Sequence, residues 1–380
     1  MLEVRLDSSY ASAARQFHVV YNSRLLPNIM ASYKLIEISQ AFNAFDDILD
    51  VRSPAEYTDD HLPGAINVPV LNDEERARIG TLYTQVSPFE AKKLGAALIA
   101  RNIAHHLEDK FCDRLKAWRP LVYCWRGGMR SGAMAHILAQ VGWNTAQLVG
   151  GYKNYRRHVI TALETLPTKF DFCVISGGTG SGKSHLLHAL SDQGAQVLDL
   201  EDLAQHRGSL LGRLPDQPQP SQKTFETRLW NTLRTFTPDR PVYIEAESRK
   251  VGVLSLPNVL VERMRTSPCV RIEVPQEARI KFLMEDYAHF LQNPTLLTER
   301  LSLLVEMHGR EITNRWCEMA RQGEWETLVG ELLTQHYDPA YKRSSGIGFQ
   351  QMKQANVLQL TSLDCDSLHK VAEDLIRNER

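Results

Sequence analysis

Residues 123–132 are Tyr123-Cys124-Trp125-Arg126-Gly127-Gly128-Met129-Arg130-Ser131-Gly132. They follow the apolar run Leu121-Val122-Tyr123, which predicts a buried strand. They precede a helical pattern of apolar residues, namely Met134, Ile137, Leu138 and Val141. Cys124 is therefore expected at the end of a strand, on a tight loop that opens onto a helix N-terminus.

The surroundings of Cys124 in the sequence favour the thiolate form of its side chain. Two glycines allow a tight turn with amide groups pointing inward, and the helix end adds partial positive charge. Arg126 and Arg130 add two full charges, and the segment from Arg114 to Leu163 has eight Lys or Arg and no Asp or Glu. Because the thiolate is the nucleophile, Cys124, Arg126 and Arg130 are the candidate catalytic residues. The alternative is a buried cysteine that acts as a small apolar residue.

Length and composition limit the possible classes of protein. The 380 residues suggest about two domains, and the net charge of −1 means that a nucleic-acid partner would need a local basic face. The six cysteines form no C-x-x-C pair, so we expect no structural metal and no disulfide framework. No apolar run is long enough to span a bilayer. We therefore expect a cytoplasmic protein with no membrane partner.

The first residues of the chain differ from the rest. Residues 1–29 lack the apolar segment of a signal peptide and have only weak periodicity. We predict a poorly ordered extension here, with an amphipathic docking arm as the alternative.

Residues 34–164 alternate predicted strands and helices, which is typical of a parallel sheet covered by helices. A helix start is predicted at residues 53–56, because Ser53 and Glu56 form a capping box and Pro54 occupies the first helical position. Cys124 would lie at the carboxyl edge of this sheet, where sites in α/β proteins usually form.

Four segments of this domain resemble a rhodanese-type sulfurtransferase. They are Asp50-Val51-Arg52-Ser53-Pro54-Ala55-Glu56-Tyr57, His61-Leu62-Pro63-Gly64-Ala65-Ile66-Asn67-Val68-Pro69, the Cys124 loop and Leu148-Val149-Gly150-Gly151. In that family the loop cysteine carries a chalcogen atom as a persulfide. The Cys-x5-Arg loop is longer than in ordinary rhodaneses and also resembles the related cysteine phosphatases, although Tyr123 replaces the histidine typical of those enzymes.

Residues 168–380 contain a phosphate-binding motif. The apolar run 170–175 predicts a strand, Leu186, Leu187 and Leu190 continue as a helix, and the intervening residues satisfy the G-x-x-x-x-G-K-S pattern. The candidate phosphate-binding residues are Gly177, Gly178, Thr179, Gly180, Ser181, Gly182, Lys183 and Ser184. The glycine amides would contact phosphate oxygens, Lys183 would supply charge, and Ser184 could ligate Mg²⁺ if a nucleotide binds.

Candidate supporting residues lie farther along this domain. Glu245 or Glu247, after the predicted strand 242–245, could orient a metal ion or water, and ordinary charge at a strand end is the alternative. His206 and Arg207 form a small basic turn that could contact phosphate or a base.

The order of the two domains resembles the bacterial tRNA 2-selenouridine synthases. The segments that carry the resemblance are the Cys124 loop, the motif at 177–184, residues 200–209 and residues 244–250. The resemblance implies an α/β protein with an N-terminal rhodanese-like and a C-terminal P-loop NTPase-like domain.

The resemblance also implies a transferase that acts on the wobble uridine (U34) of tRNAs for Lys, Glu and Gln. The 2-thiouridine is first geranylated by geranyl diphosphate, and selenium from selenophosphate then replaces the geranylthio group. Cys124 would carry selenium as an S-selanylcysteine, and the motif around Lys183 would hold the diphosphate. Implied partners are tRNA and the selenophosphate synthase; no tightly bound cofactor and a monomer are expected.

Two other classes remain open from the residues. One is a Cys-x5-Arg phosphatase, or a plain rhodanese sulfurtransferase, fused to a nucleotide-binding domain. The other is a non-enzymatic RNA-binding module with an unreactive cysteine.

Overall fold

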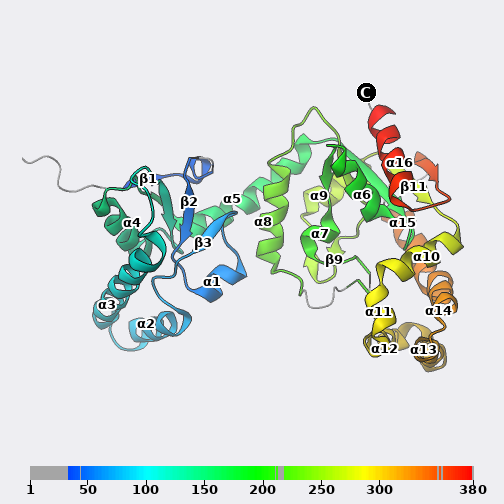
Figure 1. The fold of residues 1–380 in the computed structure, drawn as a ribbon, viewed down its shortest axis with the longest axis horizontal. Coiled ribbons are helices and arrows are strands. Elements are labelled where there is room, and N and C mark those ends of the chain that lie inside the picture. Colours follow the sequence, from blue (N-terminus) through cyan, green and yellow to red (C-terminus); the bar gives the residue numbers. More distant parts are fainter. Residues whose placement is uncertain are drawn as a thin grey trace, which may run out of the picture.

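A computed structural model describes residues 33–42, 44–209, 211–212, 218–348, 351 and 354–378. The extension predicted at residues 1–29 lies outside these residues. Within the described part, the chain forms two five-stranded sheets, each with parallel pairing, and one short antiparallel pair. Figure 1 shows the two sheets in separate lobes. The predicted α/β class with two parallel sheets is confirmed.

The first sheet has the strand order β1-β5-β4-β2-β3. Its strands are β1 (Lys34–Ile36), β2 (Asp47–Asp50), β3 (Ala65–Asn67), β4 (Pro120–Tyr123) and β5 (Ala146–Leu148). The helices of this lobe are α1 (Pro54–Asp59), α2 (Asp73–Gln85), α3 (Pro88–His106), α4 (Met129–Val141) and α5 (Gly151–Thr165). Strand β4 is buried at every residue and has β2 and β5 as neighbours, so the Cys124 loop leaves the middle of the sheet.

The predicted capping box at the start of α1 is present. The side chain of Ser53 accepts from the backbone of the third helical residue, and the Ser53 amide donates to Glu56 Oε2 at 3.2 Å. These contacts satisfy amide groups that have no partner inside a helix.

The second sheet has the order β12-β11-β6-β8-β7. Its strands are β6 (Phe172–Gly177), β7 (Gln196–Leu198), β8 (Val242–Glu245), β11 (Cys269–Glu273) and β12 (Asn356–Gln359), and the antiparallel pair is β9 (Lys250–Val251) and β10 (Leu254–Ser255). Helices around it are α6 (Lys183–Asp192), α7 (Leu200–Ala204), α8 (Gln222–Leu233), α9 (Asn258–Thr266), α15 (Asp338–Gly348) and α16 (Cys365–Asn378). The phosphate-binding motif follows β6, the central strand.

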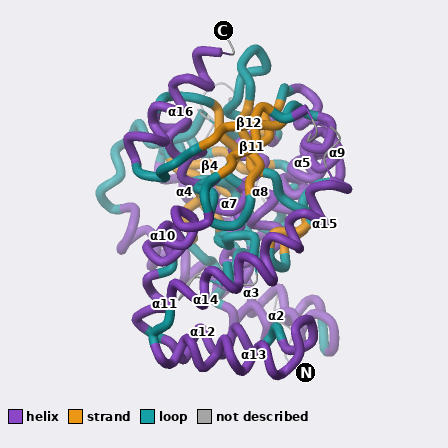
Figure 2. The backbone as a smooth tube through the Cα atoms, turned by 90° about the vertical axis from the view of Figure 1, so that its right-hand side faces the viewer, coloured by secondary structure: helices purple, strands orange, loops and turns teal. Residues whose placement is uncertain are grey.

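Further helices form a layer beside the second sheet. They are α10 (Gln276–Asp286), α11 (Ala288–Gln292), α12 (Pro294–Ser302), α13 (Val305–Gln322) and α14 (Trp325–Leu332). Figure 2 shows α11–α14 together, away from β11 and β12. They enclose their own apolar cluster, centred on the fully buried Trp316. None of the helices in the described ranges combines the length and the apolar character needed to cross a bilayer.

Helices α5 and α8 join the two lobes. The ring of Tyr155 on α5 meets that of Trp230 on α8 with centroids 5.7 Å apart, and Tyr155 donates from its hydroxyl to Thr227 Oγ1 at 3.2 Å. One buried apolar cluster runs from the first sheet through these helices into the second. The proposed domain limits of 34–164 and 168–380 stay a prediction, although α5 ends at Thr165 and β6 begins at Phe172.

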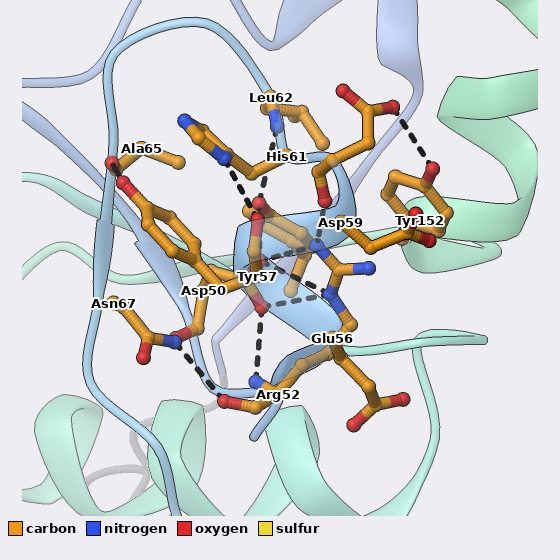
Figure 3. A network of polar contacts seen from close by, with 12 residues as sticks. Asp50, Arg52, Glu56, Tyr57, Asp59, His61, Leu62, Ala65, Asn67 and Tyr152 are labelled. Carbon is orange, nitrogen blue, oxygen red and sulfur yellow. Dashed lines mark hydrogen bonds and ion pairs between the residues drawn. The ribbon is translucent and has the colours of Figure 1, made fainter. Parts of the chain in front are cut away.

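A buried ion pair organises the carboxyl edge of the first sheet (Figure 3). The Arg52 guanidinium binds the Asp50 carboxylate, with Nη2 and Oδ2 2.6 Å apart, and the two side chains are 1% and 0% exposed. Arg52 also donates to the carbonyl of Asp60 at 2.6 Å and lies 4.0 Å from the ring centre of Tyr152. The Tyr123 hydroxyl donates to Asp50 Oδ2 at 2.7 Å, so the residue before Cys124 is fixed by the same pair.

Replacing Arg52 with methionine should lower the free energy of unfolding by about 3–5 kcal/mol, because Asp50 would keep a buried charge without a partner. Urea titration of the wild type and Arg52→Met measures the loss. The matched control is Arg119→Met: Arg119 pairs with Asp46 at 2.7 Å, but it is 48% exposed, so the loss there should be below about 1 kcal/mol. Equal small losses in both variants would contradict the structural role of Arg52.

Candidate active site

The Cys124 loop is held against the start of α5. The carbonyl of Cys124 accepts from the Tyr152 amide at 2.9 Å, and that of Trp125 accepts from the Lys153 amide at 2.9 Å. Gly151 has φ +55°, and a Cβ added there would lie 2.2 Å from the Cys124 carbonyl oxygen. Only glycine therefore allows this approach, which explains why the Gly150-Gly151 pair accompanies the cysteine loop.

Cys124 is buried, only 3% exposed, and belongs to an apolar cluster of the first lobe. The Ser131 hydroxyl donates to Sγ at 3.1 Å. Gln147 on β5 donates from its amide to Ser131 Oγ at 2.7 Å and to the Gly127 carbonyl at 2.9 Å. Ser131 and Gln147 thus position the loop, a role that the sequence analysis did not assign to them.

The two arginines of the loop differ in their surroundings. Arg130 Nη1 lies 2.7 Å from Glu56 Oε2, and the Arg130 side chain is 15% exposed. Arg126 is exposed and makes no ion pair within the described residues. Burial tends to raise the pKa of Glu56, but the hydrogen bond and charge of Arg130 outweigh it and lower that pKa. Glu56 therefore balances the charge of Arg130, and Arg126 is the loop arginine that faces solvent.

The phosphate-binding motif forms the predicted strand, loop and helix. Gly180 and Gly182 have φ of +77° and +76°, a region that favours glycine, and α6 begins at Lys183. Lys183 Nζ donates to the Gly177 carbonyl at 3.0 Å. Ser184 Oγ donates to Glu201 Oε2 at 3.0 Å. The lysine and the hydroxyl are thus held at the rim of a loop built for an anion.

Three glutamates surround this motif. Glu245 is fully buried at the end of β8 and accepts from the Glu201 amide at 2.8 Å; its Oε2 has no hydrogen-bond partner among the described residues. Burial and the nearby acidic charges raise the pKa of Glu245 well above its ordinary value. Burial, together with the charge of Glu201 and a hydrogen bond to it, raises the pKa of Glu247 to about 8. Near neutral pH, Glu247 is therefore mainly protonated.

A cavity of about 630 Å³ lies over the motif. Its walls include Lys183, Glu201 and Glu247, and also His206 and Arg207. The structure thus brings the predicted basic turn to the motif, whereas Glu245 lies behind the wall. Gly208, at φ +62°, lets the carboxylates approach, because a Cβ there would lie 2.7 Å from Oε1 of both Glu201 and Glu247.

The Arg207 side chain of the basic turn is bound by other residues of the protein. Arg207 Nη1 lies 2.6 Å from Asp286 Oδ2, and its guanidinium lies over the ring of Tyr287 at 4.6 Å. Arg207 therefore connects the cavity wall to α10. Across the described ranges, no group of three or more His, Cys, Asp or Glu side chains is arranged to hold a metal ion.

The fold and the two sites define a class: a rhodanese-like domain with a loop cysteine, joined to a P-loop domain with an anion cavity. The family model described as the rhodanese-like domain matches residues 34–158, and the tRNA 2-selenouridine synthase AAA domain matches residues 170–302. Three proteins named tRNA 2-selenouridine synthase are similar to this chain. The one from Nitrosomonas europaea is 36% identical over 290 residues, 75% of this chain and 74% of the relative. The one from Aeromonas salmonicida is 33% identical over 349 residues, 82% and 92%, and the one from Sulfurovum is 36% identical over 329 residues, 77% and 87%.

The chain belongs to the tRNA 2-selenouridine synthase family and is therefore an enzyme.

The raised pKa of Glu247 predicts a pH dependence of stability. The folded state holds a proton on Glu247 up to about pH 8, whereas the unfolded state releases it near pH 4.5. Between these values the folded state binds more protons, so the free energy of unfolding should fall as pH rises from 5 to 9. Urea titrations across this range should give a smaller decrease for Glu247→Gln than for the wild type. Glu262→Gln, at an exposed position on α9, is the control and should follow the wild type; identical slopes in all three proteins would refute the prediction.

Proposed function

We propose that this enzyme converts 2-thiouridine at the wobble position of tRNAs for Lys, Glu and Gln to 2-selenouridine through an S-geranyl intermediate. The observation that carries the proposal is the combination, in one chain, of a loop cysteine at a sheet edge and an anion cavity over Lys183. The cysteine site would handle selenium, and the cavity would hold the diphosphate of geranyl diphosphate. The tRNA and the selenophosphate donor would bind as separate molecules, and we expect no tightly bound cofactor.

In the first reaction, the sulfur of 2-thiouridine attacks C1 of geranyl diphosphate. A C–S bond forms, the C–O bond to the diphosphate breaks, and the electron pair leaves on the diphosphate oxygen. The base loses its N3 proton to solvent. Lys183 and the amides of the glycine loop stabilise the departing charge. Protonated Glu247 adds no opposing charge to the cavity wall near neutral pH.

Magnesium fits one position in this cavity. Ser184 Oγ is at the position where P-loops place a hydroxyl ligand, and hydroxyl and phosphate oxygens suit this ion. When bound with the diphosphate, Mg²⁺ would supply additional neutralisation of the leaving group. Ser184 would have to give up its hydrogen bond to Glu201 to bind the ion.

In the second reaction, selenium replaces the geranylthio group at C2. The Cys124 thiolate attacks the phosphorus of selenophosphate, an S–P bond forms, and the electron pair of the P–Se bond leaves on selenium as hydroselenide. The hydroselenide then attacks C2, geranylthiolate leaves, and the proton of the selenol moves to N3 of the base. Water finally attacks phosphorus, which breaks the S–P bond, releases phosphate and restores the Cys124 thiol.

Access to the sulfur is the structural condition for this step. Cys124 is 3% exposed, with Ser131 as its hydroxyl donor, so the thiolate would be reached through the loop and not across the apolar cluster. Exposed Arg126 is placed to attract the anionic donor.

Separate assays of the two reactions test whether Cys124 serves selenation and Lys183 serves geranylation. Cys124→Ala should still geranylate 2-thiouridine RNA but should lose selenation of pre-geranylated RNA by at least about a thousandfold, since the nucleophile is absent. Lys183→Ala should show the reverse pattern, with geranylation reduced about a hundredfold. Cys269→Ala, at a buried cysteine of β11, and Lys370→Ala, at an exposed lysine of α16, are the matched controls. Loss of geranylation in Cys124→Ala with selenation intact would reverse the assignment.

A further inference from the structure

A second, smaller cavity lies between α10 and the helical layer α11–α14. Its volume is about 70 Å³. At about 10–15 Å³ for each enclosed water, this space holds about five to seven waters, which occupy about 150–200 Å³ as liquid. Apart from hydroxyl groups and one indole N–H, the side chains of the lining are apolar; they are Thr179, Ser209, Leu211, Leu283, Met284, Tyr287, Phe290, Leu291, Leu297, Trp325, Leu328, Val329, Leu332, Leu333 and Tyr337.

This cavity adjoins the phosphate-binding cavity. The residues that line both are Thr179, Ser209, Leu283, Tyr287 and Tyr337. The glycine loop itself touches the apolar wall, because a Cβ on Gly180 would lie 2.8 Å from Leu283 Cδ1. Any group held by the loop is therefore at the mouth of the apolar cavity.

The side chain of Arg279 links helix α10, beside the small cavity, to the phosphate-binding loop. Arg279 on α10 donates from Nε to the Thr179 carbonyl at 2.9 Å, and its guanidinium binds the Asp338 carboxylate through both oxygens. Arg279 is 12% exposed. The helix that forms one side of the apolar cavity is thus tied directly to the phosphate-binding loop.

The lining chemistry identifies the occupant. None of the residues that line the small cavity, all within the described ranges, has a charged or amide side chain. A nucleotide base would find no charged or amide side chain for its polar edge here, whereas an alkyl or alkenyl chain needs none. A ligand with an anionic head and an apolar tail matches a phosphate loop that opens beside such a cavity.

We propose that this cavity holds the tail of a short prenyl diphosphate and that Leu328 limits the length of the chain. The proposal rests on the proposed function in that the diphosphate head lies on the loop around Lys183. Residues that line both cavities mark the mouth, so Phe290, Leu297 and Leu328, which line only the small one, lie deeper. Leu328 is fully buried and lines the cavity, so truncating it would enlarge the space available to a longer chain.

Chain-length selectivity tests the proposal. The assay compares kcat/KM for dimethylallyl, geranyl and farnesyl diphosphate, with inhibition by inorganic pyrophosphate as the measure of head-group binding. Leu328→Ala should raise the farnesyl-to-geranyl ratio about tenfold and leave inhibition by pyrophosphate unchanged. Leu301→Ala is the matched control, because Leu301 on α12 is equally buried but lines neither cavity. A ratio that stays unchanged in a folded Leu328→Ala protein, or that rises equally in Leu301→Ala, would overturn the proposal.

A second variant tests the same cavity without shortening a fully buried side chain. Val329 is half-buried and lines the small cavity, so Val329→Phe should narrow it with less risk to folding. Geranyl diphosphate should then lose about tenfold in kcat/KM, and inhibition by pyrophosphate should not change. Wild-type enzyme that transfers no prenyl group at all would refute the proposed function. Normal geranylation in Val329→Phe would refute only the placement of the tail.

Discussion

The ion pair between Asp50 and Arg52 is the interaction on which the arrangement of this protein depends. Two opposite charges lie almost completely out of water, so each must be matched by its partner and by further hydrogen bonds. Those further groups come from different parts of the chain: the Asp60 carbonyl, the Tyr123 hydroxyl and the ring of Tyr152. The need to satisfy one buried guanidinium therefore fixes the strand end before Cys124 and the start of α5 together. Without the ion pair, the strand end before Cys124 and the start of α5 would no longer be fixed relative to each other.

The same network continues across the join between the lobes. The Asp60 carboxylate accepts from the hydroxyls of Tyr152 and of Thr227, which lies on α8. Burial raises the pKa of Asp60, and these two hydrogen bonds oppose that effect. Helix α5 thus holds the cysteine loop with its first amides and packs against the second lobe along its length. The position of the loop is set relative to the P-loop domain and not only relative to its own sheet.

The sequence patterns predicted the features that depend only on interactions between neighbouring residues. A strand end, a glycine-rich turn and a helix start place Cys124 and Lys183 correctly, because each pattern needs only neighbouring residues. The capping box at Ser53 is correct for the same reason. The partner of Arg130 could not be predicted, because Glu56 is 74 positions away and meets it only when β2 and β4 pair. The glutamate cluster at Glu201 and the apolar cavity also arise from segments far apart in the chain, for which sequence patterns give no distance.

The protonation of the glutamates decides what the second site can bind. Lys183 and Arg279 are the cations that contact the glycine loop, and three ionised carboxylates beside Lys183 would repel a phosphate. Burial reduces this conflict, since it raises the pKa of Glu245 well above its ordinary value and, together with the charge of Glu201, raises the pKa of Glu247 to about 8. Glu201 accepts hydrogen bonds from Ser184 and Glu247. Protonation of Glu247 therefore removes one negative charge from the wall of the cavity that Lys183 also lines.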